Sequence, residues 1–212
     1  MSAWQTKPIP EESTKELDHL VLEWIVAVRN ILPGLPMDIS YVWDNNNLVS
    51  SWGTGGATIN PKLIHIALDP EFRDKERQLR YLRATVYHEL FHVVQGWSFF
   101  DNRHPEDADA ISQAYMEGAA VVFERELVDA DISYALPGEG EDLNSFYEEL
   151  LSLDDDFDYA KYKFNDPETG RKYIIYKVGV WLIDQILDKN DLGIKELATF
   201  SPSELRQLTS KM

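Results

Sequence analysis

The segment His88-Glu89-Leu90-Phe91-His92 has the residue types and the spacing of a metal-binding helix. His88 and His92 are four residues apart, so on a helix their side chains lie on one face and can bind one metal ion. Neutral imidazole is a common ligand of zinc. Glu89 is rotated by about 100° from His88, so it can flank the ion without binding it and act as general base toward a zinc-bound water. The segment therefore predicts one Zn²⁺ ion and hydrolytic chemistry.

The helix that carries these histidines is expected to have two different faces. One face is an apolar stripe, which is the usual core-facing side of a helix. It consists of Leu79, Leu82, Val86, Leu90 and Val93. The opposite side bears hydroxyl, aromatic, imidazole and amide groups without Lys or an acid, and consists of Tyr81, Thr85, His88, His92 and Gln95. We expect this second face to line a cleft; the alternative is a pair of buried histidines that hydrogen-bond to oxygen atoms.

A catalytic zinc ion has three protein ligands and one open position, so a third ligand is needed. Glu117 is the favoured residue, because it is an acid among small and apolar neighbours and a buried carboxylate needs a partner. The small residues Gly118–Ala120 would let its helix approach another helix closely. His104, Glu124 or an aspartate are the alternatives for the ligand. An ordinary salt bridge is the alternative role for Glu117.

Composition narrows the chemistry and the partners. The 212 residues include 37 Asp and Glu but 20 Lys and Arg, for a formal net charge of −17, and no Cys. Nucleic acid and anionic membranes are therefore unfavourable partners, and basic or neutral peptides would approach most easily. Without Cys, a metal must be bound by imidazole and carboxylate groups. The first residues do not predict a secretory signal and no apolar stretch approaches the roughly 20 residues of a membrane span, so we expect a cytoplasmic protein.

The first half of the chain is expected to form a helix and a small sheet. Ser13 and Glu16 form a capping-box pattern at the start of a helix that Pro33-Gly34 ends. Ile39–Trp43 and Leu48–Trp52 resemble the two strands of a hairpin. Gly53–Gly56 reads as a loop, and Lys62–Leu68 as a further strand, whose edge could add an extended peptide.

After Pro70 the sequence predicts mainly helices. Their expected ranges are Glu71–Gln95, Ala108–Val128, Leu143–Ser152, Tyr173–Asp188 and a short helix capped by Ser201. The acidic run Asp154–Asp158 reads as a solvated loop, with a calcium site as the alternative. The predicted class is α+β: a helix and a small mixed or antiparallel sheet packed on the zinc helix, then a mainly helical C-terminal half. We expect one domain over 1–212, with helix and sheet in 13–68, active-site helices in 71–128 and a helical part in 143–212.

The two motifs together resemble a known class of enzyme. His-Glu-Leu-Phe-His-Val-Val-Gln, followed by Glu-Gly-Ala-Ala-Val-Val-Phe-Glu, is similar to the gluzincin zinc metallopeptidases, and most similar to uncharacterised bacterial families of predicted zinc-dependent proteases. The order of hairpin, Gly-rich loop, strand and zinc helix resembles the layout of those families. So do the later segments Tyr173–Gly179 and Ala198–Glu204. The likeness extends from Leu35 to the C-terminus.

This resemblance implies a zincin-like fold and a set of site residues. The implied zinc ligands are His88, His92 and Glu117, with Glu89 as general base and acid. A tyrosine from a later helix would stabilise the oxyanion, and Tyr176 is the candidate, although a core tyrosine fits that position equally well; His104 is a second candidate for the oxyanion.

The chain departs from the best-known gluzincins at one position. It has Val121 where they carry an aspartate that orients a zinc histidine. The resemblance then leaves that role to Asp107, Asp109 or Glu124. The function expected from all this is zinc-dependent hydrolysis of a peptide or protein substrate. The alternatives are a non-catalytic binding module, with or without zinc, and an amidase that acts on a small molecule.

Overall fold

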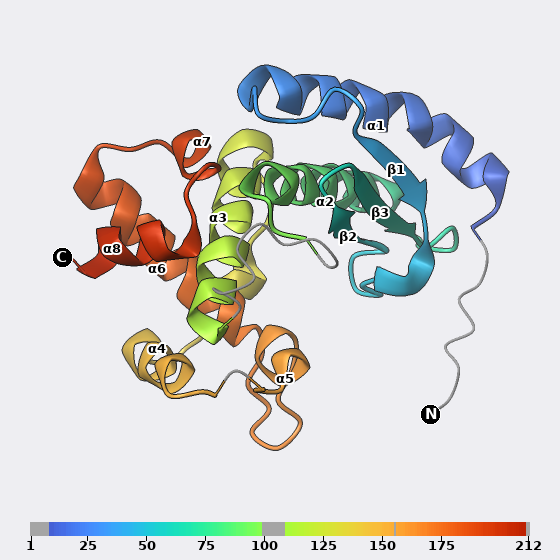
Figure 1. Cartoon of the computed structure of the whole chain (residues 1–212). Coiled ribbons are helices and arrows are strands. Elements are labelled where there is room, and N and C mark those ends of the chain that lie inside the picture. The colour runs from blue at the N-terminus through green and yellow to red at the C-terminus, as the bar shows by residue number, and fades with distance from the viewer. Residues whose placement is uncertain (1–8, 99–108, 155, 211–212) are drawn as a thin grey trace. The chain divides into compact units, whose positions relative to one another are not determined.

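The computed structural model describes residues 9–98, 109–154 and 156–210 and has the predicted α+β composition. The chain forms two compact units, residues 1–102 and 103–212 (Figure 1). The first contains the sheet, and the second is helical in its described part. The helix of His88 falls in the first unit and the helix of Glu117 in the second. The expectation of a single domain stays a prediction.

The sheet of the first unit has three strands in the order β1-β3-β2. They are β1 (Ser40–Trp43), β2 (Thr54–Asn60) and β3 (Leu63–Leu68). β1 runs parallel to β3, and β2 runs antiparallel to it. Alternation places Ile64 and Ile66 on the face of β3 that is fully buried. The predicted strand at Lys62–Leu68 is therefore confirmed to within one residue.

The unit has two long helices, α1 (Glu11–Ile31) and α2 (Lys75–Gln95); α2 packs against β2 and β3, and α1 packs against α2. Tyr41 and Trp43 of β1 both donate hydrogen bonds to Asp18 of α1, at 2.8 and 2.9 Å. On the other side of β3, the register pairs Gly56 with Ile66 and Thr58 with Ile64. Paired residues point to the same face, so β2 directs its small side chains toward α2.

The predicted hairpin is wrong. Leu48–Trp52 is not a strand; its Val49 makes an isolated bridge to Thr54, and the partner of β1 is β3. The turn between β1 and Leu48–Trp52, η1 (Asn45–Asn47), is a 3₁₀ turn capped by Asp44. The segment expected as a glycine loop enters β2. β3, proposed as a peptide-binding edge, is instead the central strand with neighbours on both sides.

The starts of both long helices also differ from expectation. α1 begins after Pro10, so Ser13 lies inside the helix and its predicted capping box does not form. Pro10 is extended, and Glu11 and Glu12 place negative charge in the first turn, where the helix dipole favours it. α2 begins at Lys75, four residues later than predicted, because the side chain of Asp74 accepts from the backbone N–H of Arg77.

The second unit is built around α3 (Ala110–Val128), which is buried around nearly its whole circumference until Glu124. Its main partner is α6 (Ile174–Asn190). The smaller elements around this pair are η3 (Ser133–Ala135), α4 (Leu143–Leu151), α5 (Tyr159–Lys163), α7 (Ile194–Leu197) and α8 (Pro202–Ser210). The capped helix after Ser201 is confirmed, since Ser201 and Glu204 exchange hydrogen bonds between side chain and backbone.

α3 and α6 touch through their glycines. A Cβ added to Gly118 would lie 2.2 Å from the carbonyl carbon of Gly179, and one added to Gly179 would lie 2.1 Å from the backbone oxygen of Ala114. The two backbones therefore approach too closely for any side chain. The close approach that Gly118–Ala120 predicted is confirmed.

Two remaining observations concern the outside of the chain. Asp154, Asp156 and Asp158 are exposed, and Asp158 caps α5 by accepting from the backbone N–H of Lys161. Among the described residues, no helix has the length and apolar character that a membrane span requires.

Candidate metal site

The two histidines of α2 are positioned as a pair. His88 is 9% exposed and His92 4%, and their Nε2 atoms lie 3.1 Å apart. Two nitrogen ligands of one tetrahedral zinc ion, each at about 2.0–2.1 Å, would be about 3.3 Å apart. The rings are close to perpendicular, at 84°. The pair thus has nearly the separation that a shared zinc ion requires.

A hydrogen bond fixes the orientation of His92. Its Nδ1 lies 2.7 Å from Oε1 of Gln95, one turn further along α2. An amide oxygen accepts, so this contact places the proton on Nδ1 and directs the lone pair of Nε2 toward His88. A metal-binding histidine generally has such an outer partner. Gln95 therefore holds the ring of His92 in place, and the part of Asp107, Asp109 or Glu124 in orienting a zinc histidine stays a prediction.

Two of those three acids have other partners in the described structure. Asp109 caps α3 and binds Arg206 through both oxygens, at 2.6 and 2.7 Å. Glu124 accepts a hydrogen bond from the hydroxyl of Tyr134 at 3.1 Å. Asp107, like His104, lies outside the described residues.

Glu89 is held by strand β2. The hydroxyl of Thr58 lies 2.9 Å from Oε2 of Glu89 and 2.8 Å from its backbone oxygen. Gly56 makes the room for this side chain, since a Cβ there would come within 2.8 Å of Cγ of Glu89 and 2.7 Å of Thr85. The glycines of this segment, expected to form a turn, instead let β2 approach α2. Glu89 is 7% exposed, so its carboxylate is buried and fixed.

Glu117 lies in the second unit, near the middle of α3, and is 2% exposed. Nζ of Lys163 is 2.6 Å from its Oε1, and the hydroxyl of Tyr159 donates to the same oxygen at 3.3 Å. Burial lowers the pKa of Lys163, but the negative charge of Glu117 outweighs it and the net shift is upward. Burial and the same carboxylate raise the pKa of Tyr159. Glu117 therefore forms a buried salt bridge with Lys163, the contact that the sequence had left open as the alternative to metal binding.

Tyr176 belongs to the same group of side chains in the second unit. Its ring centre is 5.5 Å from Nζ of Lys163 and 5.5 Å from the ring of Tyr134. Lys163 also lies 5.1 Å from the centre of the Tyr159 ring. The aromatic rings thus surround the cation that binds Glu117. Whether Tyr176 stabilises an oxyanion stays a prediction.

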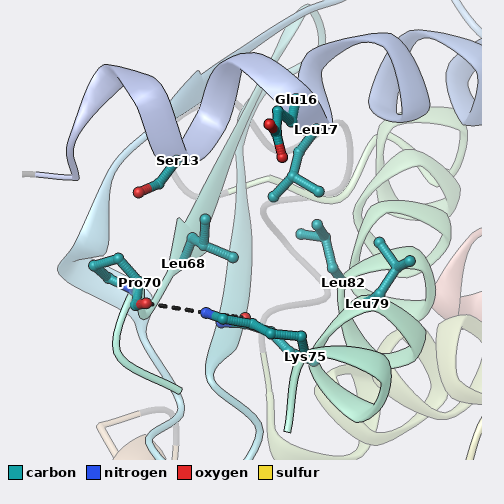
Figure 2. Close-up of a pocket in the computed structure, with 9 residues that line it drawn as sticks. Ser13, Glu16, Leu17, Leu68, Pro70, Lys75, Leu79 and Leu82 are labelled. Carbon is teal, nitrogen blue, oxygen red and sulfur yellow. Dashed lines mark hydrogen bonds between the residues drawn. The ribbon is translucent and has the colours of Figure 1, made fainter. Parts of the chain in front are cut away.

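A pocket of the first unit is separate from these residues. It has a volume of about 390 Å³ and lies between α1, the end of β3 and the first turns of α2 (Figure 2). Leu17, Leu68 and Leu82 form its apolar wall. Lys75 stands at its edge and donates to the backbone oxygen of Pro70 at 3.0 Å. None of its lining residues is a candidate ligand or the candidate base.

Several contributors to the site were missed from the sequence. Thr58 and Gly56 reach Glu89 only through the sheet, and Lys163 reaches Glu117 only through the fold of the second unit, so no local pattern marks them. Gln95 is different, because its position three residues after His92 was visible in the helix pattern.

Comparison with known proteins adds no family to this picture. No protein-family model, no curated protein and no solved structure matches the chain.

Proposed function

We propose that His88, His92 and Glu117 bind one zinc ion and that the protein is a zinc-dependent peptidase of the gluzincin type with a zincin-like fold. The observation that carries this proposal is the pair of buried imidazoles with Nε2 atoms 3.1 Å apart, on the same helix turn as a buried glutamate. Glu117 is a buried carboxylate of the type that completes such a ligand set. The donor set of two imidazoles and a carboxylate also suits a chain without Cys.

In peptide hydrolysis, each of these side chains would have a separate role. Gln95 orients His92, and His88 and His92 present neutral imidazole nitrogens. A bound zinc ion would lower the pKa of its water to about 7 and polarise the carbonyl of the substrate. Glu89 would accept the proton of the attacking water and donate it to the leaving amine. The hydrogen bond from Thr58 would keep the carboxylate of Glu89 in place during these transfers.

The substrate is proposed to be a peptide or protein. β2 is a strand at the edge of the sheet, and it carries the residues that contact Glu89. An extended peptide adds its backbone hydrogen bonds at an edge strand, so β2 replaces β3 in the role that the sequence had suggested. Tyr176 remains the proposed group for the oxyanion.

The test has a metal part and a chemical part. Protein purified without a histidine tag should contain one zinc ion per chain and should melt at a higher temperature when zinc is restored after chelation. Glu89→Gln should retain zinc and lose peptide cleavage, whereas Glu23→Gln, an exposed acid on α1, should retain both. Cleavage by Glu89→Gln at the wild-type rate would contradict the role of Glu89.

A second function is favoured by one specific contact. Glu117 already has a cationic partner, Lys163 at 2.6 Å, so its charge is balanced without a metal ion. A module that binds a partner protein and holds no metal is consistent with this pair. Such a module would show no zinc-dependent change in melting temperature, and the same titration therefore separates the two functions.

A further inference from the structure

The pocket of the first unit is lined by four leucines, and part of their surface is open to water (Figure 2). Leu68 and Leu82 belong to the core, with exposed fractions of 3% and 0%, whereas Leu79 is 38% exposed and Leu17 is half-buried. Apolar surface in contact with water favours a ligand that covers it. The volume of about 390 Å³ falls within the range of small-molecule sites, about 300–1,000 Å³.

Lys75 brings to this pocket an ammonium group that is held by neutral oxygen atoms. Its Nζ donates to the backbone oxygen of Pro70 at 3.0 Å and to Oε1 of Gln78 at 3.2 Å. Gln78 is 4% exposed, and its Nε2 donates to the backbone oxygens of Gly53 and Asp69. An ammonium group has three N–H donors, so these two contacts leave one. Lys75 forms no ion pair with any described residue, and its remaining donor is therefore available to an anion.

Glu16 of α1 brings the opposite charge. It is the sixth residue of its helix, beyond the first turn, in which the helix dipole favours an acid. The residues three and four positions away, which could form an ion pair with it on the helix, include no Lys or Arg; they are Glu12, Ser13, His19 and Leu20. Its carboxylate makes no ion pair or hydrogen bond within the described part of the chain. The charge of Glu16 therefore has no structural reason within α1.

The two charges border the pocket from opposite sides. Figure 2 shows Ser13 and Glu16 projecting from α1 on one side and Lys75 on the other, with leucine side chains between them. Glu16 and Lys75 form no salt bridge with each other, so neither neutralises the other. A ligand with complementary charges would neutralise both at once. The pocket therefore suits a small molecule with an apolar middle, a cationic group at one end and an anionic group at the other.

We propose that this pocket binds a short peptide of two or three residues with free termini and apolar side chains. Its carboxylate accepts from Nζ of Lys75, its amino group donates to Glu16, and its side chains cover the leucines. A sphere of the pocket's volume is about 9 Å across, and two or three residues of extended chain span about 7–10 Å. A single α-amino acid does not suit the pocket, because one carbon atom carries both of its charged groups. The site is independent of the proposed function, since no candidate ligand or base lines it.

Calorimetric titration of the protein with leucyl-leucine is the first test. A chelator is present throughout, so that the peptide cannot bind through a metal ion. We expect leucyl-leucine to bind. N-acetyl-leucyl-leucine and leucyl-leucine amide each lack one charge and should bind at least about tenfold more weakly, as loss of a hydrogen bond between charged groups predicts. Glycyl-glycine has both charges without apolar side chains and should not bind at the same concentrations.

Two variants assign each terminus of the peptide to its partner. Lys75→Gln should bind leucyl-leucine and its amide with equal affinity, and Glu16→Gln should bind leucyl-leucine and its N-acetyl form with equal affinity, because each variant lacks the group that distinguishes them. Both side chains are exposed, so neither substitution disturbs the core. The matched controls are Lys195→Gln and Glu23→Gln, which remove the same charges at exposed positions outside the pocket and should bind as the wild type does.

Three results would overturn the proposal. The first is no binding of leucyl-leucine at millimolar concentrations. The second is binding that neither Lys75→Gln nor Glu16→Gln weakens, because the peptide would then occupy another site. The third is binding of octanoate as tight as that of leucyl-leucine and weakened by Lys75→Gln alone, because the pocket would then be a site for an apolar acid.

Discussion

Thr58 of β2 places one hydroxyl within 2.9 Å of Oε2 and 2.8 Å of the backbone oxygen of Glu89 on α2. The strand thus orients both the side chain and the backbone of the candidate general base. Thr58→Val keeps the shape of the side chain and removes the hydroxyl. We expect a loss of about 1–3 kcal/mol in the free energy of unfolding, since a buried hydrogen bond to a charged group is lost. Urea unfolding measures this.

The same variant tests the proposed chemistry. Peptide cleavage by Thr58→Val should fall through kcat, with zinc affinity unchanged, because Thr58 contacts the base and neither histidine. Thr58→Ser retains the hydroxyl and should retain most of the activity. Wild-type kcat in Thr58→Val would show that Glu89 does not depend on this contact.

Gly56 is expected to tolerate no side chain. A Cβ at this position meets Thr85 at 2.7 Å and Glu89 at 2.8 Å. Gly56→Ala should therefore destabilise the first unit by about 1–3 kcal/mol, as overpacking does, and reduce cleavage by displacing Glu89. Gly138→Ala is the control, since its Cβ meets nothing closer than 3.4 Å. Thermal unfolding of the two proteins, side by side, checks the difference.

Gln95 is expected to set the affinity for zinc. Gln95→Leu removes the acceptor that fixes the tautomer of His92, and loss of such an outer partner lowers metal affinity by about 10- to 100-fold. Gln95→Glu retains an acceptor oxygen and should stay near the wild-type affinity. Competition with a chromophoric chelator measures both constants. An unchanged affinity in Gln95→Leu would show that the bond to Gln95 has no part in metal binding.

Because Lys163 and Glu117 form a buried salt bridge, we expect the effect of replacing one of them on the free energy of unfolding to depend on whether the other is present. Lys163→Met leaves a buried carboxylate without its cation, which costs about 3–5 kcal/mol. Lys163→Met/Glu117→Gln removes both charges and should recover much of that loss. Urea unfolding of the wild type, both single variants and the double variant gives the coupling energy. Additive effects would mean that the two groups do not interact.

The helices and the central strand were predictable because their signals are local. The periodic pattern ending at Gln95 predicts α2, and alternation in Lys62–Leu68 predicts β3. The partner of a strand is not local: Ile39–Trp43 showed that a strand exists, but its pairing with β3 depends on a contact more than twenty residues away. The glycines before Thr58 were misread for the same reason, since their neighbour is a distant helix.

In the candidate site too, the residues that share one helix were predictable and the residues from distant segments were not. Spacing alone was enough to propose His88, Glu89 and His92 as a group, because one helix carries all three. Glu89 is held by a residue of β2. Glu117 is held by residues of α5, a five-residue helix that the sequence pattern did not predict. Sequence therefore identifies the groups that would react more readily than the groups that position them.

The contact of Gly118 with Gly179 has a mechanical consequence for Glu117, its neighbour in the chain. With the two backbones in direct contact, α3 cannot turn about its axis or slide along α6 without a collision of main-chain atoms. The backbone that carries Glu117 is therefore rigid, and its carboxylate moves by rotation about the bonds of its own side chain. Any larger displacement of this group must carry α3 and α6 together as one body.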